Sequence, residues 1–302
     1  MSITITGAGG FLGQRVTKLL ADRGEELVLA DLVPPPNPPE GAKVLKGNLA
    51  ETLPQAITKD TKAVIHLAAV VSAGAEADFG QGYRVNLAGL RRVLERCRAM
   101  ETRPKFLFTS SLAVFGAVEQ VDDSTATMPQ SSYGTQKALG ELLVNDYSRK
   151  GFIDGRTLRL PTVVIRPGKP NAAASSFASG ILREPLAGEE SICPVSPDLA
   201  LWIASPSSVT NALIHGLDLP DDALAPWRVL NVSGITVTVR EMVEALGRAG
   251  GDTSLVKFQH DPAIDAIVGS WPALFQTPRA VDLGFSPADD LDTLVQSHIA
   301  GL

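Results

Sequence analysis

Short apolar runs alternate along the chain with segments that have the spacing of amphipathic helices. The strand-like runs cover residues 3–6, 27–31, 43–46, 63–68, 105–110 and 157–165. Strands that alternate with helices are typical of a parallel, doubly wound sheet with helices on both faces. The pattern therefore predicts an α/β fold of the Rossmann type.

A glycine-rich turn follows the first strand-like run. Gly7, Gly10 and Gly13 stand between this run and a helix-like segment over residues 14–20. Glycines permit a tight turn that lets the backbone approach a pyrophosphate, whose charge is met by the N–H groups at the start of the helix. We predict a dinucleotide site at this turn.

The second strand-like run ends at Asp31, about eighteen residues after Gly13. An acidic side chain at this spacing accepts hydrogen bonds from the 2′-hydroxyl of the adenosine ribose. It would repel the 2′-phosphate of NADP. The sequence therefore predicts NAD as the cofactor.

The ends of later runs supply further predicted cofactor contacts. Small residues after a strand let the backbone pass close to a dinucleotide. The expected contacts are Asn48, Leu49, Leu67, Ala68, Ala69 and Asn86. Asn86 is expected to start a helix that runs to about Met100 and to tie this helix to the active-site strand. His66 shows no partner acid, so we assign it a structural role.

A set of residues suited to proton transfer follows the fifth strand. Ser111 ends the run that begins at Thr109, and Tyr133 and Lys137 lie one helical turn apart. A tyrosine has an ordinary pKa of about 10, so a cation such as Lys137 must favour its phenolate. Tyr133 would take the proton of an alcohol, Ser111 would hold the same oxygen, and the adjacent carbon would pass its hydride to NAD. These residues predict an oxidoreductase.

Composition and charge exclude several classes of partner. The chain has 302 residues, with 27 basic and 33 acidic residues and a net charge of −6. It has no basic run with interleaved aromatics, so we expect no nucleic-acid partner. Cys97 and Cys193 have no spacing for zinc or a disulfide framework, so no metal site is predicted. Without an apolar segment of membrane length or an export signal, we expect a cytoplasmic protein with no membrane partner.

Together these motifs resemble the extended short-chain dehydrogenases/reductases, which include NAD-dependent epimerases and dehydratases. The resemblance runs from end to end, and its motifs are Thr6-Gly7-Ala8-Gly9-Gly10-Phe11-Leu12-Gly13, Asp31, His66-Leu67-Ala68-Ala69, Asn86, Ser110-Ser111-Leu112-Ala113-Val114-Phe115-Gly116 and Tyr133-Gly134-Thr135-Gln136-Lys137. Ser111 matches the catalytic position, whereas Phe115 stands where the family usually has Tyr. The resemblance implies a C-terminal substrate lobe, a homodimer, and further NAD contacts at Phe11, Leu12, Thr109 and Pro161.

The second half of the chain is expected to return once to the main sheet. Residues 207–217 and 229–233 have the patterns of a helix and a strand, and residues 239–249 have the spacing of an amphipathic helix. We therefore predict an NAD-binding domain formed by residues 1–161 and 205–234. A smaller substrate-binding lobe would comprise residues 162–204 and 235–302.

Within the family, residues 159–186 resemble a branch that oxidises a four-carbon sugar acid, D-erythronate, at C2 to 2-oxo-tetronate with NAD. A small polyhydroxy acid needs short hydroxyl donors and one carboxylate clamp, for which arginine is suited. This segment supplies Arg166, Lys169, Asn171, Ser175, Ser176 and Arg183. We favour Arg183 as the clamp because it follows the serines on a predicted helix that faces the cleft, whereas Arg166 would brace a strand end.

Two further positions resemble those of the short-chain L-threonine dehydrogenases. Ser72 would bond the substrate carboxylate directly, as an alternative to Arg166 or Arg183, and Trp271 would close the cleft or belong to the core. The complete set of expected substrate contacts is Ser72, Ser111, Tyr133, Thr162, Ser175, Ser176, Arg183 and Trp271.

Other functions can use the same residues. Nucleotide-sugar epimerases and dehydratases retain their NAD through the cycle, an L-threonine 3-dehydrogenase acts on a 3-hydroxy acid, and a non-catalytic sensor would only bind the dinucleotide. The short, serine-rich loop argues against a nucleotide-sugar pocket, and intact catalytic residues argue against a sensor. We therefore predict NAD-dependent oxidation of a small hydroxy acid, with D-erythronate preferred.

Overall fold

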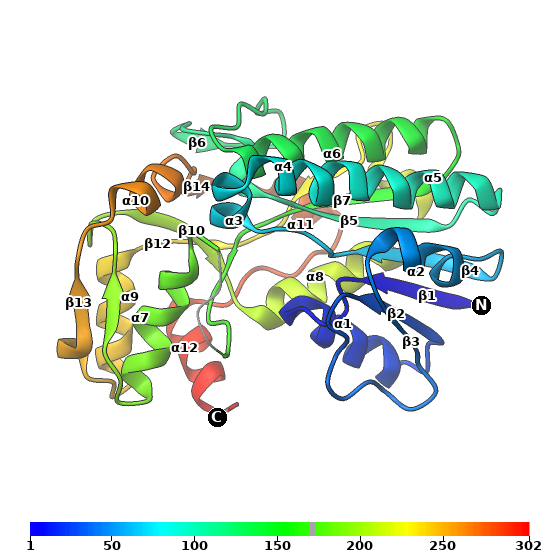
Figure 1. Ribbon diagram of the computed structural model, residues 1–302. Coiled ribbons are helices and arrows are strands. Elements are labelled where there is room, and N and C mark those ends of the chain that lie inside the picture. Colours follow the sequence, from blue (N-terminus) through cyan, green and yellow to red (C-terminus); the bar gives the residue numbers. More distant parts are fainter. Residues whose placement is uncertain (169–172, 302) are drawn as a thin grey trace.

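The computed structural model describes residues 1–168 and 173–301, and its centre is a parallel sheet (Figure 1). Within the described residues this sheet has seven strands in the order β11-β7-β5-β4-β1-β2-β3. The strands are β1 (Ser2–Thr6), β2 (Leu27–Asp31), β3 (Lys43–Lys46), β4 (Thr61–His66), β5 (Lys105–Ser111), β7 (Asp154–Leu160) and β11 (Val229–Asn231). The predicted α/β fold with a doubly wound parallel sheet is confirmed.

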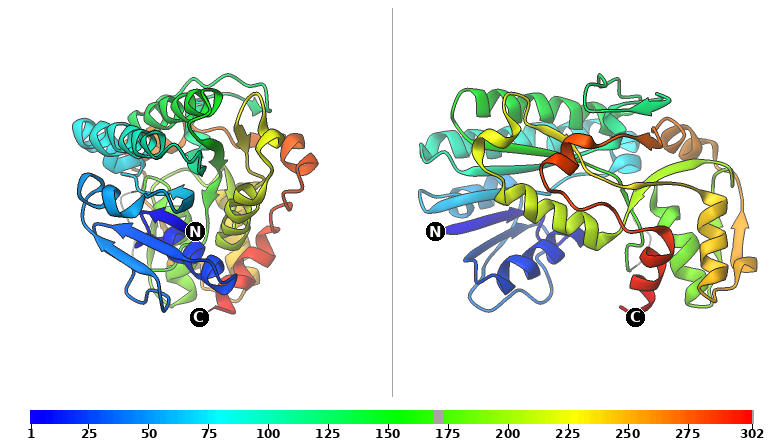
Figure 2. Two further views of the ribbon diagram at one scale, coloured as in Figure 1. Left: turned by 90° about the vertical axis from the view of Figure 1, so that its right-hand side faces the viewer. Right: turned by 180° about the vertical axis from the view of Figure 1, so that it is seen from behind.

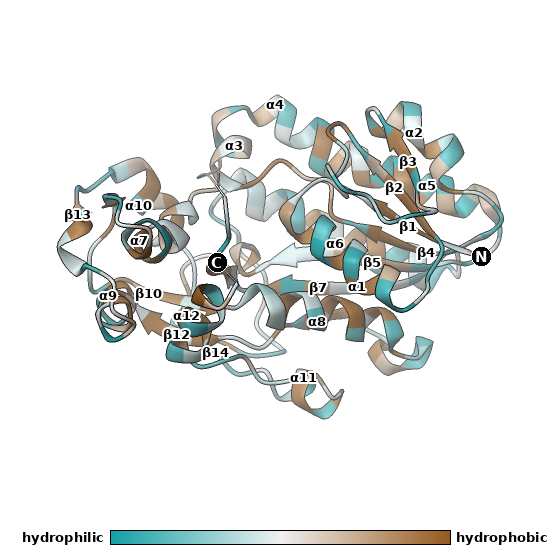
Figure 3. Ribbon diagram, turned by 90° about the horizontal axis from the view of Figure 1, so that it is seen from below, coloured by the Kyte–Doolittle hydropathy of each residue, from teal (hydrophilic) through white to brown (hydrophobic). Residues whose placement is uncertain are grey.

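Helices cover both faces of this sheet, as the two further views show (Figure 2). On one face Ile5 and Leu29 pack against α1 (Phe11–Asp22) and α8 (Pro206–Asp218). Side chains of alternate register, such as Val64, pack on the other face against α2 (Leu49–Ala56), α5 (Leu90–Met100) and α6 (Ser132–Arg149). A sheet buried on both faces has nearly continuous apolar strands, which explains the runs in the sequence. Figure 3 shows this concentration of hydrophobic residues in the strands.

Several predicted boundaries are wrong by a few residues or by a change of element. The helix expected to start at Asn86 is preceded by α3 (Ser72–Ala77) and α4 (Phe79–Gly82) and opens with a π-helix over Tyr83–Gly89. Asn48 does not end a strand but caps α2, because its side chain and that of Glu51 form a reciprocal capping box. The run predicted over residues 157–165 divides into β7 and the short β8 (Thr162–Val163).

A smaller assembly of elements lies beside the carboxyl ends of the main strands. It contains the sheet β12-β10-β8, in which β10 spans Ala200–Ala204 and β12 spans Ile235–Thr238. It also contains β9 (Ser191–Cys193), β13 (Val256–Phe258), α7 (Ser176–Leu186), α9 (Val239–Arg248), α10 (Pro262–Val268) and α12 (Leu291–Ile299). These elements share their own apolar core, to which Ile181 and Met242 belong. The domain boundaries drawn from the sequence stay a prediction.

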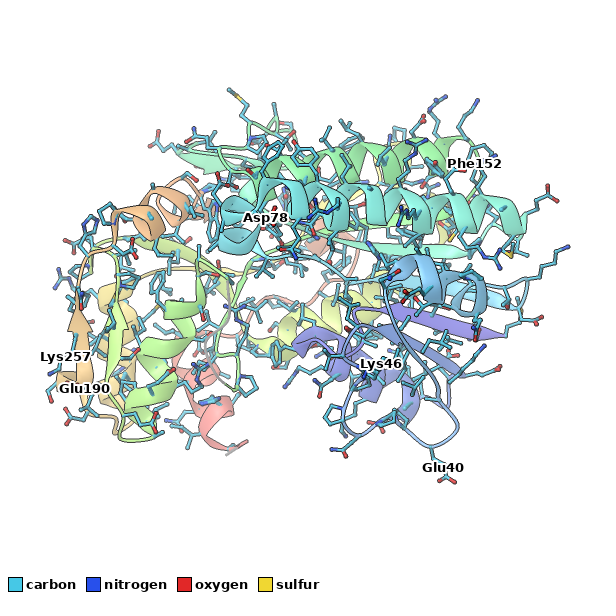
Figure 4. The ribbon with its side chains drawn as sticks, viewed as in Figure 1. Glu40, Lys46, Asp78, Phe152, Glu190 and Lys257 are labelled. Atoms are coloured by element: carbon cyan, nitrogen blue, oxygen red, sulfur yellow. The ribbon has the colours of Figure 1, made fainter. Side chains whose placement is uncertain are left out.

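Short elements connect the two assemblies. The strand β14 (Leu274–Phe275) pairs with β6 (Gln120–Val121), and α11 (Pro278–Asp282) follows it. Three 3₁₀ turns complete the described elements, namely Leu112–Val114, Asp221–Leu224 and Thr253–Leu255. At the outer end of the smaller assembly Lys257 lies beside Glu190, 3.4 Å away (Figure 4). Among the described helices, none has the length and apolarity that a membrane crossing requires.

Candidate active site

The turn between β1 and α1 is packed so tightly that it requires glycine. Gly7 has a φ of 76°, and a Cβ on it would lie 2.5 Å from the backbone nitrogen of Ala68. A Cβ on Gly13 would lie 2.2 Å from the carbonyl oxygen of Gly7, and one on Gly9 would lie 1.8 Å from that of Val33. The helix N-cap is Gly10, which makes no side-chain capping bond. The N–H groups of the first turn of α1 are therefore suited to bind an anion.

A cavity of about 730 Å³ extends from this turn along the strand ends. The predicted contacts that line it are Gly7, Gly10, Asp31, Asn48, Leu49, Leu67, Ala68 and Ala69. The carboxylate of Asp31 accepts hydrogen bonds from the N–H of Gly9 at 2.8 Å and from that of Val33 at 3.0 Å. The acid is therefore fixed beside the turn. A turn without Cβ atoms, an open helix N-terminus and a fixed carboxylate together fit a dinucleotide.

Some residues of this cavity were not predicted from the sequence. Gly9, Val70, Arg84 and Arg92 also line it. Gly9 lies in the same loop as Gly7 and Gly10. It is not part of the pattern that Gly7, Gly10 and Gly13 form at intervals of three residues, so that pattern does not predict it. Two arginines close to Asn86 were a detectable signal for an anionic ligand, whose charge a guanidinium can bind.

Asn86 does not line this cavity but holds a residue that does. Its side chain accepts from the N–H of Val70 at 2.8 Å and donates to the carbonyl oxygen of Val70 at 2.9 Å. It also donates to the amide of Gln136 on α6 at 2.6 Å. Asn86 thus connects the π-helix to the segment after β4, and its predicted contact with the cofactor stays a prediction.

A second cavity, of about 200 Å³, adjoins the carboxyl end of β5. The three predicted catalytic residues, Ser111, Tyr133 and Lys137, all line it. Leu12, Thr109 and Pro161 line it as well, whereas Phe11 and Gly13 lie nearby in α1 without lining either cavity. Residues far apart in the sequence therefore meet at one small hollow.

Lys137 is buried and directed at the backbone of β5. Its ammonium group donates to the carbonyl oxygen of Thr109 at 2.7 Å and lies 5.6 Å from the ring centroid of Tyr133. Burial lowers the pKa of Lys137 to about 8, while the negative charge of Glu141, one turn further along α6, acts in the opposite direction. The pKa of the lysine is therefore close enough to neutral pH for its ammonium group to exchange a proton there.

The pKa of Tyr133 is shifted in the opposite direction to that of Lys137. Removal of its hydroxyl from water raises its pKa to about 12, while a hydrogen bond with Ser111 and the positive charge of Arg166 each act to lower it. The phenol is therefore protonated before any ligand binds. The sequence predicted Lys137 as the cation that favours the phenolate. In the structure the cation whose charge acts to lower the pKa of Tyr133 is Arg166, and the role of Lys137 stays a prediction.

The two adjacent serines at the end of β5 differ in their partners. The hydroxyl of Ser110 donates to the carboxylate of Glu141, which also accepts two hydrogen bonds from Arg159, at 2.8 and 2.7 Å. This buried network engages Ser110 with α6. Ser111 instead accepts from the N–H of Ala113 at 3.2 Å and lines the small cavity. The geometry therefore favours Ser111 for contact with a substrate.

The predicted substrate contacts are only partly gathered at this cavity. Ser72, Thr162, Ser175 and Trp271 line it, and the hydroxyl of Ser72 accepts from the N–H of Ala174 at 2.9 Å. Ser176 begins α7 outside the lining. Two residues that the sequence added to this set, Lys169 and Asn171, fall outside the described residues.

Arg183 does not face the cavity as predicted. Its guanidinium donates to the backbone carbonyl of Arg166 and forms an ion pair with Glu184. It is Arg166 that lines the cavity. The expectation that Arg183 faces the cleft is therefore wrong, because α7 turns Arg183 toward the backbone of Arg166. Which residue binds a carboxylate stays a prediction.

His66 has a structural environment, in line with its predicted role. Its Nδ1 lies 2.7 Å from the hydroxyl of Thr6 on the neighbouring strand β1. Burial, aided by the positive charge of Lys137, lowers its pKa to about 3. The imidazole is therefore neutral at physiological pH and joins two strands of the sheet.

Comparison with known proteins places these features in context. The model of the NAD dependent epimerase/dehydratase family matches residues 3–202. The D-erythronate dehydrogenases of Cupriavidus necator and Haemophilus influenzae are each 47% identical to this chain; the first alignment covers 100% of the chain and the second 99%, and each covers 99% of the relative. A crystal structure titled as a nucleoside-diphosphate-sugar epimerase from Agrobacterium tumefaciens is 40% identical, with a TM-score of 0.91 over 99% of this chain and 94% of that chain.

Proposed function

Because this chain belongs to the NAD-dependent epimerase/dehydratase family, we propose that it oxidises D-erythronate at C2 to 2-oxo-tetronate. The chain is an NAD-dependent oxidoreductase that acts on a CH–OH group. The observation that supports this choice of substrate is the 47% identity, over essentially the whole chain, with two D-erythronate dehydrogenases. The small cavity beside Tyr133 supports a substrate of this size.

The proposed mechanism assigns one task to each residue at the end of β5. When bound, NAD supplies a nicotinamide ring that accepts a hydride. Tyr133 takes the proton of the substrate hydroxyl as the C–H bond of the same carbon breaks and its electron pair leaves as hydride. Ser111 hydrogen-bonds the reacting oxygen and holds it toward Tyr133. The charge of Lys137 favours the phenolate once the positive nicotinamide ring adds to it.

Cofactor binding is proposed to follow the larger cavity. The backbone of the glycine turn and of the first turn of α1 would meet the pyrophosphate, which assigns Gly7, Gly10, Phe11, Leu12 and Gly13 to this end. Asp31 would accept from the adenosine ribose and exclude the 2′-phosphate of NADP. The segments after β3 and β4 would flank the adenine and the ribose. Thr109, Lys137 and Pro161 would meet the nicotinamide end because they line the smaller cavity.

Substrate binding is proposed to use short side chains around the smaller cavity. Ser72, Thr162 and Ser175 would donate to or accept from the hydroxyls of a sugar acid, and Trp271 would close the cleft. Ser176 begins α7 directly after Ser175, which lines the cavity, and it is assigned the same task. A substrate with several hydroxyls suits a wall of such residues.

A second candidate function is that of a nucleotide-sugar epimerase, which the name of the Agrobacterium protein favours. A nucleotide sugar is far larger than a tetronate, and ligand pockets for molecules of that kind have volumes of roughly 300–1,000 Å³. The cavity at Tyr133 holds about 200 Å³. We therefore rank the epimerase, and an activity on L-threonine, below oxidation of a sugar acid.

The proposal is tested by following NADH formation with a panel of acids. NAD would be combined in turn with D- and L-erythronate, D- and L-threonate, glycerate and L-threonine. Turnover with D-erythronate above all others supports the proposal, whereas preference for L-threonine keeps the chemistry and changes the substrate. Silence across the panel, with NADH retained on the purified protein, would favour the epimerase.

We also propose that the protein is a cytoplasmic homodimer. Support comes from α6, where Leu139 is 37% and Leu142 56% exposed, so that two large apolar side chains lie at the surface of one helix. Copies that pack through these helices would cover them. Light scattering on the purified protein gives its mass, and a charged residue at Leu142 should yield monomers.

A further inference from the structure

The smaller cavity contains a cation that no acidic side chain neutralises. Arg166 follows β8 and lines the cavity together with Ser111 and Tyr133. Within residues 1–168 and 173–301 Arg166 forms no ion pair. The charge that acts on it most strongly is the positive charge of Arg183, which lowers the pKa of Arg166. A partly buried guanidinium without a counter-ion is costly unless a ligand supplies one.

Two nitrogen donors at this place lack acceptors. Nη2 of Arg166 and the indole Nε1 of Trp271 are both buried, and neither has a hydrogen-bond partner among the described residues. Buried donors without acceptors are rare in folded proteins because they lose their hydrogen bonds with water and gain none in return. Both residues line the same cavity. The group that would satisfy them accepts hydrogen bonds and carries negative charge, and a carboxylate has both properties.

We infer that Arg166 binds the carboxylate of the substrate, with Trp271 as a second donor, and that Arg166 thereby determines selectivity for acids. The inference rests on the proposed function in taking the substrate to be a hydroxy acid. Arg166 and Tyr133 share one small cavity, so a carboxylate held by Arg166 places the neighbouring carbons of a short chain beside the proposed base.

The helix α7 holds this arginine in place through its backbone. The hydroxyl of Ser179 accepts from the N–H of Arg166 at 3.0 Å, and the guanidinium of Arg183 donates to its carbonyl oxygen. Glu184 in turn pairs with Arg183. Three residues of one helix thus fix both sides of the Arg166 backbone, so Arg183 is a positioning residue rather than the clamp.

Arg166 also acts on the proposed base. Its positive charge lowers the pKa of Tyr133 against the effect of burial. Loss of this charge should therefore raise the pKa of the phenol, so that the rise of activity with pH moves to higher pH. This shift of the pH–activity profile distinguishes an electrostatic role of Arg166 from a merely structural one.

The test compares an acid with a neutral molecule of the same carbon skeleton. Binding of D-erythronate and of erythritol to the protein–NADH complex is measured by calorimetry for the wild type, Arg166→Met, Arg166→Lys and Arg183→Met. An exposed arginine of the same lobe, Arg240, provides the control Arg240→Met. Binding needs no turnover, so the result does not depend on the proposed reaction.

We expect the wild type and Arg240→Met to bind the acid far better than the polyol. Arg166→Met should lose about 100-fold in affinity for the acid and change little toward erythritol, because a charge-assisted, bidentate contact is lost. Arg166→Lys should recover part of the loss, since lysine keeps the charge without the fork, and Arg183→Met should show a smaller loss.

Three results separate this inference from the proposed function. If the wild type oxidises D-erythronate and Arg166→Met keeps its kcat/KM and its pH profile, the assignment of Arg166 is overturned and the function stands. If the acid binds through Arg166 but no NADH forms, the clamp stands and the proposed reaction fails. Equal affinity of the wild type for acid and polyol would overturn the inference whatever the reaction is.

Discussion

Two adjoining cavities of this molecule are built in different ways. The larger one is lined at the glycine turn by backbone and small residues, and Asp31 is bonded there to two backbone N–H groups; further from the turn, Arg84 and Arg92 add charged side chains. The smaller one, at Tyr133, is walled by hydroxyls, two cations and an indole. The glycine turn of the larger cavity is shaped by main-chain geometry, whereas the functional groups of the smaller cavity are side chains from distant segments.

This difference predicts different consequences for substitutions. A change at the glycine turn of the larger cavity alters the path of the backbone, so it should affect folding and cofactor affinity together. A change in the smaller cavity removes a functional group from a wall that other elements support, so it should affect turnover or substrate affinity while the fold persists.

Replacement of Tyr133 by Phe should give the largest effect and leave the larger cavity unaltered. The phenol is the proposed proton acceptor, so kcat should fall about 10³-fold, within the range for loss of a general base. Affinity for NAD, measured by calorimetry, should stay within about twofold of the wild type. Full activity in Tyr133→Phe would exclude this mechanism.

Replacement of Gly9 by Ala should damage the larger cavity as a whole. Its Cβ would overlap the carbonyl oxygen of Val33, whereas a Cβ on the neighbouring Gly10 would lie 3.3 Å from its nearest neighbour, the carbonyl oxygen of Gly7. We expect Gly9→Ala to lose about 2 kcal/mol of unfolding free energy, as overpacked sites do, and Gly10→Ala to lose less. Urea unfolding of both variants provides the comparison. Equal stability of the two would contradict the steric account of this turn.

Replacement of Asp31 by Asn should change cofactor selection without changing catalysis. Loss of the charge should weaken NAD binding about tenfold, because a hydrogen bond to an ionised group contributes about 1.5 kcal/mol or more. Binding of NADP should improve, since the repulsion of its 2′-phosphate is removed. Dissociation constants for both dinucleotides give the ratio. An unchanged ratio would show that Asp31 does not contact the adenosine ribose.

Protonation of His66 makes folding depend on pH, and its effect is small near neutral pH. Its pKa in the folded protein is about 3, below the ordinary value of 6.5, so between these values the unfolded chain binds more protons. The stability that neutral His66 provides is therefore complete above about pH 6.5 and falls as the pH drops toward 3, by up to about 1.4 kcal/mol per pH unit. Urea unfolding near neutral pH and at about pH 5.5 gives the free energy of unfolding at both values. The difference between the two should be smaller in His66→Gln than in the wild type. The same slope in both proteins would refute this assignment.

The sequence was most informative where a few consecutive residues define the structure. The first strand, the glycine turn and the position of Asp31 could be predicted because each depends on local backbone geometry. Tyr133 and Lys137 were readable because one helical turn fixes their separation. Gly9 was missed because its need for glycine comes from Val33, on the segment that follows β2.

The smaller cavity was less predictable because its contacts join distant segments. The bond from Ala174 to Ser72 spans 102 positions, and no local pattern indicates it. The choice between Arg166 and Arg183 depended on the orientation of α7, which turns Arg183 onto the backbone of Arg166. Periodicity predicts that a helix exists but not which neighbour each of its side chains will meet.

In the proposed reaction a hydride leaves C2 of a small hydroxy acid for NAD, and the resulting NADH is released. The most direct measurement uses D-erythronate with deuterium at C2 and determines the isotope content of the free NADH by mass spectrometry. We expect NADH that carries one deuterium from the substrate, and a slower reaction than with the unlabelled acid. Free NADH without deuterium, or deuterium returned to the carbon product with no NADH released, would contradict it.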